Sequence, residues 1–391
     1  MINETFDYLK DCIETMDMFR MLNESHDHIE AAASKFSDCE RVLVIGTGGS
    51  SLGGKCLVNF EALYSGRVPR VTFLENVDSR HFVNVINDYD KDRTGIIVIS
   101  KSGRTTETLM LFASICELWR NFDYAGKAIA ITELSESSTL MKVAKSKGVS
   151  VLEHNPKIGG RFSVFSIVGL LPALLGGVDI KAFTDGARTL IGHVTRASTP
   201  DECSVFSDIV DMYNVVRSGR VNIHVIMAYS DLLGDYCKWA IQLISESLGK
   251  SESFGITPVG ATGTIDQHSM LQLFLGGPSD KVFTVVTQKN NTHTAEVNCD
   301  LLGPLHGCNI HDLMLSHQQA TIEVLKEKAF VRVLEFGELN VWVVGYLMAL
   351  SFVEVITMAK LAGVNPFDQP AVEASKKLAM HYLGEHSGQL D

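Results

Sequence analysis

Positive charge is scarce in this chain of 391 residues. Lysine and arginine number 34 against 46 aspartates and glutamates, which gives a formal net charge of −12 at pH 7. A protein that binds nucleic acid or anionic membrane over a whole surface needs a basic surface, so we expect neither partner. The negative net charge does not exclude the binding of a small anion in a local basic pocket. Charged residues make up only 20% of the chain and apolar residues 46%, which excludes a disordered chain and predicts a large core.

The chain also lacks an apolar run long enough for a membrane span, which needs about 20 residues. The longest apolar stretch is 339–353, fifteen residues without a charge, bracketed by Glu338 and Glu354. We expect a buried core helix there. The first 22 residues are acidic, whereas a secretory leader is basic and then apolar. We therefore expect a cytoplasmic protein.

Paired cysteines are missing as well. The cysteines are scattered and form no C-x-x-C motif, so the sequence predicts reduced thiols and neither a disulfide framework nor a zinc site. The eight positions are Cys12, Cys39, Cys56, Cys116, Cys203, Cys237, Cys299 and Cys308.

Short β-branched apolar runs alternate with segments long enough for helices. The first series of expected strands is 41–45, 71–74, 95–100, 128–132 and 149–152, and the second is 223–228, 281–286 and 330–336. This alternation predicts an α/β fold in which each half has a parallel sheet with helices on both faces. We expect domains at 39–180 and 181–338, with helical segments at 1–38 and 339–391.

A glycine-rich run, Gly46–Gly54, follows the first expected strand. Glycine lets the backbone turn sharply and approach a ligand, and the helix that follows offers free N–H groups to an anion. Such runs are also typical of dinucleotide sites, and Glu75 stands at about the distance of the acid that binds the ribose there. The segment alone does not decide between a dinucleotide site and a tight turn with no ligand.

A second loop, Ser100–Thr108, leaves the end of the third expected strand. It offers five hydroxyls, one lysine, one arginine and a glycine within nine residues. Hydroxyls and backbone N–H groups can surround a phosphate, and the dipole of the following helix favours its charge. An ordinary helix cap explains one hydroxyl but not the cluster. The loop therefore predicts phosphate binding beyond the carboxyl ends of the strands.

Four further side chains suit acid–base or anion chemistry, and each has a plainer explanation. Arg161 follows two glycines and can stabilise an anion, or lie at the surface where a helix starts. Glu246 stands near the end of a helix, where it can act as a base or be solvated. His268 is of a residue type that suits proton transfer, and Lys376 follows a loop, but a lone histidine or lysine is often incidental.

Taken together, these segments resemble the glucose-6-phosphate isomerase family, from about residue 40 to residue 380 and in the family order. The signature G-G-R-[FY]-S stands at 159–163, and F-D-Q-x-G-V-E-x-x-K stands at 367–376. The loop at 100–103 resembles the SKSG-type loop of sugar-isomerase (SIS) domains. The motifs E-S-x-G-K and G-x-x-x-Q-H stand at 246–250 and 263–268. The resemblance implies two SIS domains with helical extensions at both ends.

The resemblance also implies a reaction: the interconversion of glucose 6-phosphate and fructose 6-phosphate through a cis-enediol, in glycolysis and gluconeogenesis, with no metal and no cofactor. The family's base corresponds to Glu246, and its enediolate-stabilising arginine corresponds to Arg161. The histidine and the lysine that open the sugar ring in the family correspond to His268 and Lys376. The residues that match the sugar-phosphate contacts are Ser50, Ser100, Lys101, Ser102 and Thr105.

The same resemblance implies a homodimer with shared active sites, because the family's histidine comes from the neighbouring subunit. Glu107 is a candidate for orienting that histidine. The chain is short for the family, Arg104 stands where the family has a small or hydroxyl residue, and Ala371 replaces the signature glycine. Two alternatives remain: an isomerase of another phosphosugar, such as mannose 6-phosphate or an arabinose phosphate, and a non-catalytic sugar-phosphate sensor. The presence of Glu246, His268 and Lys376 argues against the sensor.

Overall fold

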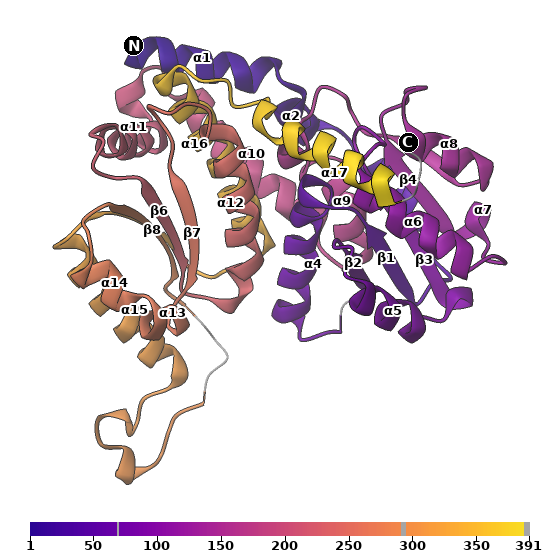
Figure 1. The fold of residues 1–391 in the computed structure, drawn as a ribbon. Coiled ribbons are helices and arrows are strands. Elements are labelled where there is room, and N and C mark those ends of the chain that lie inside the picture. Colours follow the sequence, from indigo (N-terminus) through magenta and orange to yellow (C-terminus); the bar gives the residue numbers. More distant parts are fainter. Residues whose placement is uncertain (69, 291–294, 387–391) are drawn as a thin grey trace.

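Two parallel sheets organise the chain, and helices cover both of them (Figure 1). The computed structural model describes residues 1–68, 70–290 and 295–386. Within these ranges the first sheet has five strands in the order β2-β1-β3-β4-β5, and the second has four in the order β7-β6-β8-β9. Every neighbouring pair of strands in the two sheets is parallel. The predicted α/β fold with two parallel-sheet halves is confirmed.

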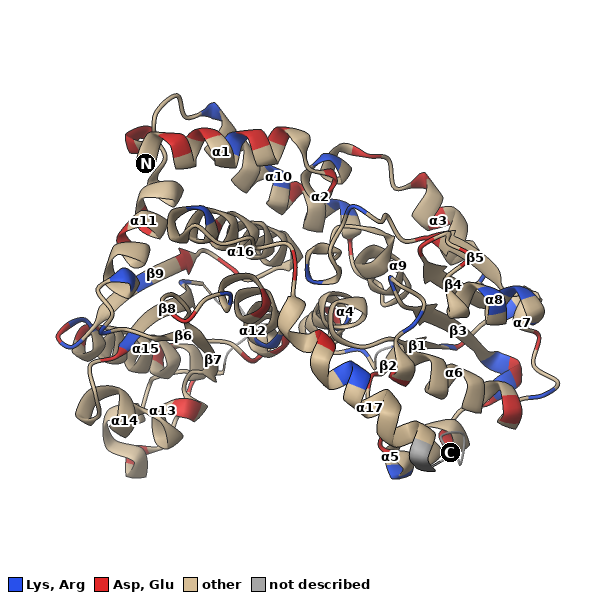
Figure 2. Ribbon diagram, turned by 45° about the horizontal axis from the view of Figure 1, so that its top comes forward, with Lys and Arg blue, Asp and Glu red and all other residues tan. Residues whose placement is uncertain are grey.

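The N-terminal segment consists of short helices: α1 (Ile2–Thr15), α2 (Asp17–Arg20), η1 (Met21–Asn23) and α3 (Asp27–Ser34). Helix α1 is amphipathic. Its inner side buries Phe6, Leu9 and Ile13, while its acidic residues are exposed on the outer side (Figure 2).

The first half follows the predicted alternation closely. Its strands are β1 (Arg41–Ile45), β2 (Val71–Leu74), β3 (Thr94–Ile99), β4 (Ala128–Thr132) and β5 (Ser150–Glu153). Its α-helices are α4 (Leu52–Ser65), α5 (Ser79–Asp88), α6 (Thr106–Leu118), α7 (Tyr124–Lys127), α8 (Thr139–Ser146) and α9 (Ile167–Leu175). Short 3₁₀ turns complete it: η2 (Gly48–Ser50), η3 (Lys91–Arg93) and η4 (Gly160–Phe162).

The second half contains one strand more than the sequence predicts. Its strands are β6 (Ile223–Ala228), β7 (Thr257–Thr262), β8 (Lys281–Gln288) and β9 (Phe330–Phe336). Its α-helices are α10 (Ile180–Arg196), α11 (Ser204–Arg217), α12 (Gly234–Leu248), α13 (Ile265–Ser269), α14 (Leu271–Gly276), α15 (Ile310–Lys326), α16 (Val341–Ala362) and α17 (Glu373–His386). Its 3₁₀ turns are η5 (Pro200–Glu202), η6 (Asp231–Leu233), η7 (Asp300–Leu305) and η8 (Pro370–Val372).

Strand β7 is the strand that the sequence does not predict. Its segment contains Pro258 and Gly260, which weaken a strand pattern. Both are tolerated because β7 lies at the edge of its sheet and pairs only with β6. Gly260 also lets α12 approach closely, since a Cβ there would lie 3.1 Å from the Cβ of Cys237.

Strands β1 and β3 lie side by side at the centre of the first sheet. All six residues of β3 are buried, as expected for a parallel strand covered on both faces. Because the two strands are neighbours and parallel, the glycine-rich run after β1 and the hydroxyl-rich loop after β3 leave the sheet at the same edge.

Helix α16 is the buried helix expected from the apolar stretch. By length and composition it could cross a membrane, but 83% of its most apolar window is buried inside the protein. It packs against α10 at two glycines that allow close backbone approach, Gly186 and Gly345. A Cβ at either position would come within 2 Å of a carbonyl oxygen of the other helix. The predicted core helix is confirmed.

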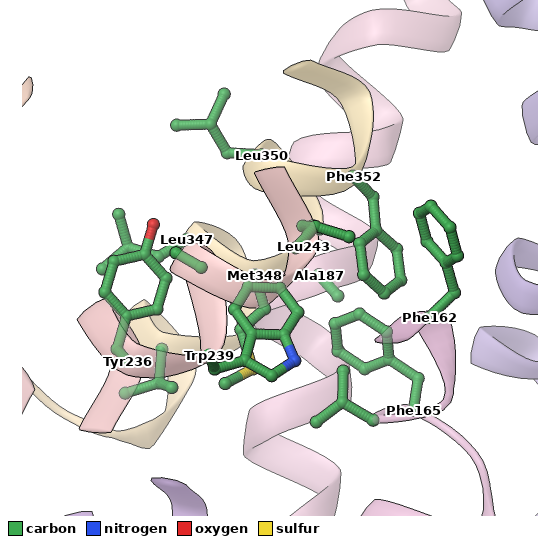
Figure 3. Packing of buried hydrophobic residues seen from close by; sticks show 14 of the residues in the cluster. Phe162, Phe165, Ala187, Tyr236, Trp239, Leu243, Leu347, Met348, Leu350 and Phe352 are labelled. Carbon is green, nitrogen blue, oxygen red and sulfur yellow. The ribbon is translucent and has the colours of Figure 1, made fainter. Parts of the chain in front are cut away.

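Aromatic side chains join the two halves at the centre of the molecule (Figure 3). The ring of Phe352 on α16 lies 5.0 Å from Phe162 in η4 and 5.8 Å from Trp239 on α12, between ring centroids. Phe162 follows the first sheet, whereas Trp239 belongs to the second half. This packing fixes the backbone beside Arg161 against α12. The domain boundaries at residues 38, 180 and 338 stay predictions.

Candidate active site

Glu246, near the end of α12, is held on both carboxylate oxygens. Its Oε2 accepts a hydrogen bond from Nη1 of Arg161 at 3.0 Å, and its Oε1 accepts one from Nε2 of Gln242 at 2.9 Å. Gln242 stands one helical turn before Glu246 on the same face of α12. The Arg161 side chain is only 2% exposed, whereas that of Glu246 is 32% exposed. The carboxylate therefore has a fixed orientation and still faces solvent.

Arg161 uses all five of its N–H donors within the chain. Besides Glu246, its Nη1 donates to Oε1 of Gln369 at 2.8 Å, and its Nε donates to Oγ of Ser247 at 2.9 Å. Its Nη2 donates to the backbone oxygens of Pro366 and Asp368. One buried guanidinium thus joins η4, the end of α12 and the turn before α17. Burial lowers the pKa of Arg161, and the neighbouring Glu246 opposes that shift.

The glycine-rich run packs directly against the Arg161 segment. Gly48 has a φ of +59°, and a Cβ at Gly49 would lie 2.2 Å from the carbonyl carbon of Gly160. Ser50 closes the 3₁₀ turn η2 within this run. The glycines here allow one loop to touch another.

Glu75, the acid that left the dinucleotide interpretation open, is engaged by its own chain. Its Oε1 accepts a hydrogen bond from Oγ of Ser51 at 2.6 Å, and its Oε2 forms an ion pair with Lys55. Both partners belong to the glycine-rich run and to α4, which follows it. Glu75 therefore stabilises the turn after β1.

The hydroxyl-rich loop forms a tight turn between β3 and α6. Oγ of Ser100 donates to Oγ1 of Thr105 at 2.9 Å, and Oγ of Ser102 accepts from the backbone N–H of Arg104 at 3.2 Å. Gly103 has a φ of +62°, and a Cβ there would clash with Oγ of Ser138 at 1.8 Å. The Thr105 side chain does not cap α6, so it leaves the N–H groups of the first turn to other acceptors.

Lys101 and His154 lie at this edge of the sheet, and burial lowers the pKa of both. Nζ of Lys101 lies 3.8 Å from Oε1 of Glu133. Burial is the main cause that lowers the pKa of Lys101, with the charge of Arg161 adding to it and Glu133 opposing it. His154, at the end of β5, is 1% exposed, and burial lowers its pKa to about 4. It is therefore neutral at pH 7.

Lys376 lies in the first turn of α17. Its side chain is 62% exposed, and its Nζ pairs with Oε1 of Glu373 at 2.8 Å. That hydrogen bond is the main cause of the lowered pKa of Glu373, and Lys377 and Arg104 contribute through their charges. Arg104, the residue unusual for the family, thus acts electrostatically on the first turn of α17. Ala371 lies exposed in η8, where its backbone needs no glycine.

His268 lies at the other end of the second half from Glu246. It is exposed on α13, which follows the carboxyl end of β7, whereas the end of α12 lies where β7 begins. The six residues of β7 span about 20 Å, so one chain does not bring His268 to its own Glu246. Glu107, in the first turn of α6, accepts a hydrogen bond from Thr106 at 3.0 Å and is likewise far from His268 in sequence and fold.

Sequence reasoning did not single out four polar residues of this site. Gln242, Ser247 and Gln369 are partners of Glu246 or Arg161, and His154 lies beside Lys101. Ser247 and Gln369 stand inside the quoted signatures, and Gln242 precedes Glu246 by four residues, so their positions carried a signal. Nothing in the local sequence marks His154. Among the described residues, no three His, Cys, Asp or Glu side chains are grouped to hold a metal ion.

Comparison with known proteins decides the family. The phosphoglucose isomerase family matches residues 3–389. The chain belongs to the phosphoglucose isomerase family. It is 32% identical over 393 residues to the glucose-6-phosphate isomerase of Rubrobacter xylanophilus, an alignment that covers 94% of this chain and 89% of that protein. The family predicted from the signatures, and the isomerase activity predicted with it, are confirmed.

Solved structures share the fold of this chain. The crystal structure of a hypothetical protein from Thermus thermophilus superposes with a TM-score of 0.86 at 28% identity, covering 97% of this chain and 94% of that one. The crystal structure of a glucose-6-phosphate isomerase from Chlamydia trachomatis superposes with a TM-score of 0.80 at 23% identity. The superposition covers 95% of this chain and 75% of that one. At that identity the second comparison shows the fold alone.

Proposed function

We propose that Glu246 is the general base with which this chain performs its family's reaction, the interconversion of glucose 6-phosphate and fructose 6-phosphate. The observation that carries the proposal is the carboxylate fixed between Arg161 and Gln242 while a third of its side chain stays exposed. The reaction moves a proton between C2 and C1 through an enediolate. A base of fixed orientation can serve both carbons, because they are adjacent atoms of one substrate.

Arg161 supplies positive charge to the base and to the enediolate. Its side chain is buried and all five donors are engaged, so its charge is held in place and does not have to reorganise during the reaction. The guanidinium holds the carboxyl group of Glu246 in place through the hydrogen bond from Nη1. It stabilises the negative charge that moves onto the substrate afterwards.

The hydroxyl-rich loop and the glycine-rich run bind the phosphate group. Ser50, Ser100, Ser102 and Thr105 supply hydroxyls, and Lys101 supplies a positive charge. The support for this assignment is that both segments leave neighbouring strands at one edge of the sheet, beside Arg161. The N-terminus of the 13-residue helix α6 adds free N–H groups, which favour an anion.

His268 and Lys376 open the sugar ring, and the histidine comes from a second copy of the chain. The separation of about 20 Å along β7 keeps His268 from the Glu246 of its own chain. Large apolar side chains are also exposed where a second copy can cover them. Leu301 in η7 is 96% exposed and Ile310 at the start of α15 is 72% exposed. A homodimer with shared sites explains both features.

A coupled assay tests the activity. Fructose 6-phosphate is supplied with EDTA present, and the glucose 6-phosphate formed is detected. We expect turnover that chelation does not change. Turnover of mannose 6-phosphate but not of fructose 6-phosphate would favour the other phosphosugar isomerase, and binding without turnover would favour the sensor.

We also propose that the protein is located in the cytoplasm. All eight cysteines are free thiols in the structure, which suits a reducing compartment. Detection of the chain in a cytoplasmic fraction tests this.

A further inference from the structure

His268 lies on a very short helix, α13. The helix has five residues, Ile265–Ser269, too few to be stable alone in water. Within the described ranges the His268 side chain has no hydrogen bond and no ion pair of its own, and it is exposed. The direction in which its ring points is therefore set by whatever holds the helix.

Asp266 holds one side of α13. Its Oδ2 accepts a hydrogen bond from the backbone N–H of Thr262, the last residue of β7, at 2.7 Å. Its Oδ1 accepts one from Oγ of Ser269, the last residue of the helix, at 2.8 Å. This carboxylate links the start of α13 to its end. Outside the helix its hydrogen bond reaches only β7, the strand that precedes α13.

Gln267 ties α13 to the rest of the domain. Its Nε2 lies 2.8 Å from the hydroxyl of Tyr229, which follows β6 and is 1% exposed. The same Nε2 contacts Oγ1 of Thr321 and donates to the backbone oxygen of His317 at 3.2 Å, both on α15. One amide therefore joins α13 to β6 and to α15.

Neighbouring positions on a helix point about 100° apart, so the direction of Gln267 fixes the direction of the exposed His268. We propose that Gln267 is the positioning residue for His268, fixing the imidazole that one subunit delivers to the active site of its partner. The proposal rests on the shared-site function given above. Gln267 itself touches no substrate; it acts through the direction of the His268 side chain.

The first test removes the amide without removing the histidine. Gln267→Ala and Gln267→Met are compared with Gln272→Ala, an exposed glutamine on the next helix. Displacement of a reacting group by about 1 Å can lower a rate by roughly 100-fold. We expect both Gln267 variants to lose roughly 10- to 100-fold in kcat with little change in KM, and the control to stay near wild type. Gln267→Met keeps the volume, so it also serves where the alanine variant does not fold.

The second test asks which subunit the defect belongs to. Gln267→Ala is mixed with Glu246→Gln and the subunits are allowed to exchange. In the heterodimer, one site combines the intact Glu246 of the first chain with the correctly held His268 of the second. Random pairing makes half of the dimers mixed, and half of their sites intact, so the mixture should recover about a quarter of wild-type activity. Gln267→Ala mixed with His268→Ala should recover none.

A general structural defect would give a different pattern. A Gln267→Ala chain that misfolds cannot donate a working Glu246, so its mixture with Glu246→Gln would stay inactive, and this result would overturn the proposal. So would a kcat near wild type in both Gln267 variants. The mixture of His268→Ala with Glu246→Gln is the reference: if it fails to recover activity after confirmed exchange, the shared-site function is wrong, independently of Gln267.

Discussion

Glu246 is the residue whose replacement tests the chemistry most directly. Glu246→Gln keeps the shape of the side chain and its contact with Arg161, but removes the proposed base. We expect kcat to fall by roughly 10²–10⁴, the usual contribution of general-base catalysis, with substrate affinity within several-fold. Exposed Glu252, replaced in the same way, is the control. Near-normal turnover in Glu246→Gln would show that another carboxylate is the base.

Gly49 tests whether contact between the two loops positions Arg161. A Cβ at this position would lie 2.2 Å from the backbone of Gly160, so Gly49→Ala must push the loops apart. Overpacking of this kind costs about 1–3 kcal/mol of stability. We expect a lower free energy of unfolding in urea and a lower kcat. Gly234→Ala is the matched control, because a Cβ at Gly234 meets open space, and an equal effect in both variants would contradict the argument.

At the scale of elements, we expect the hydroxyl-rich loop 100–108 to bind the phosphate through its hydroxyls. Ser102→Ala and Thr105→Ala each remove a proposed hydrogen bond to the phosphate, a loss of about 1.5–3 kcal/mol. We expect KM to rise at least 10-fold in each, with a smaller change in kcat. Thr106→Ala in the same loop is the control, because that hydroxyl donates to Glu107. Equal KM values in the three variants would place the phosphate elsewhere.

The elements also show what a sequence can and cannot predict. The strands β1, β3 and β4 are predictable because buried parallel strands are continuous apolar runs, as the fully buried β3 illustrates. The edge strand β7 is not, because Pro258 and Gly260 contradict the strand pattern and only the edge position tolerates them. Signatures predicted Glu246 and Arg161, but the turn at 366–369 meets Arg161 only through tertiary packing. No local pattern encodes that contact.

At the scale of the whole molecule, we expect acid to weaken the fold through two buried histidines. Burial lowers the pKa of His154 and of His224 to about 4, whereas an unfolded histidine titrates near about 6.5. Between these values the unfolded chain binds more protons, so the free energy of unfolding falls as pH drops from about 6.5 to about 4. Each histidine contributes up to about 3 kcal/mol, and this contribution is complete above a pH of about 6.5.

Urea unfolding at pH 7, 5.5 and 4.5 measures this loss. Replacement of both histidines by glutamine should flatten the pH dependence, although the variant is less stable at pH 7. Replacement of exposed His81, the control, should leave the pH dependence unchanged. The same loss of stability on acidification in the double variant would assign it to other groups.

The whole molecule should be active only as a dimer. His268 is separated from the Glu246 of its own chain by the length of β7, so under the proposed shared site an isolated chain has no histidine beside its Glu246. We expect specific activity to fall on dilution in parallel with dissociation measured by sedimentation. Monomers that retain full activity would mean that ring opening uses groups of the same chain.

Arg161 has a consequence for how this scaffold can change over time. The same five N–H groups that set the charge beside Glu246 also fasten the first half to α12 and to the turn before α17. A substitution there alters chemistry and architecture together, so selection cannot tune one without the other. Adaptation to a new sugar phosphate must therefore begin elsewhere, and exposed Arg104, which forms no part of that junction, is the freer position.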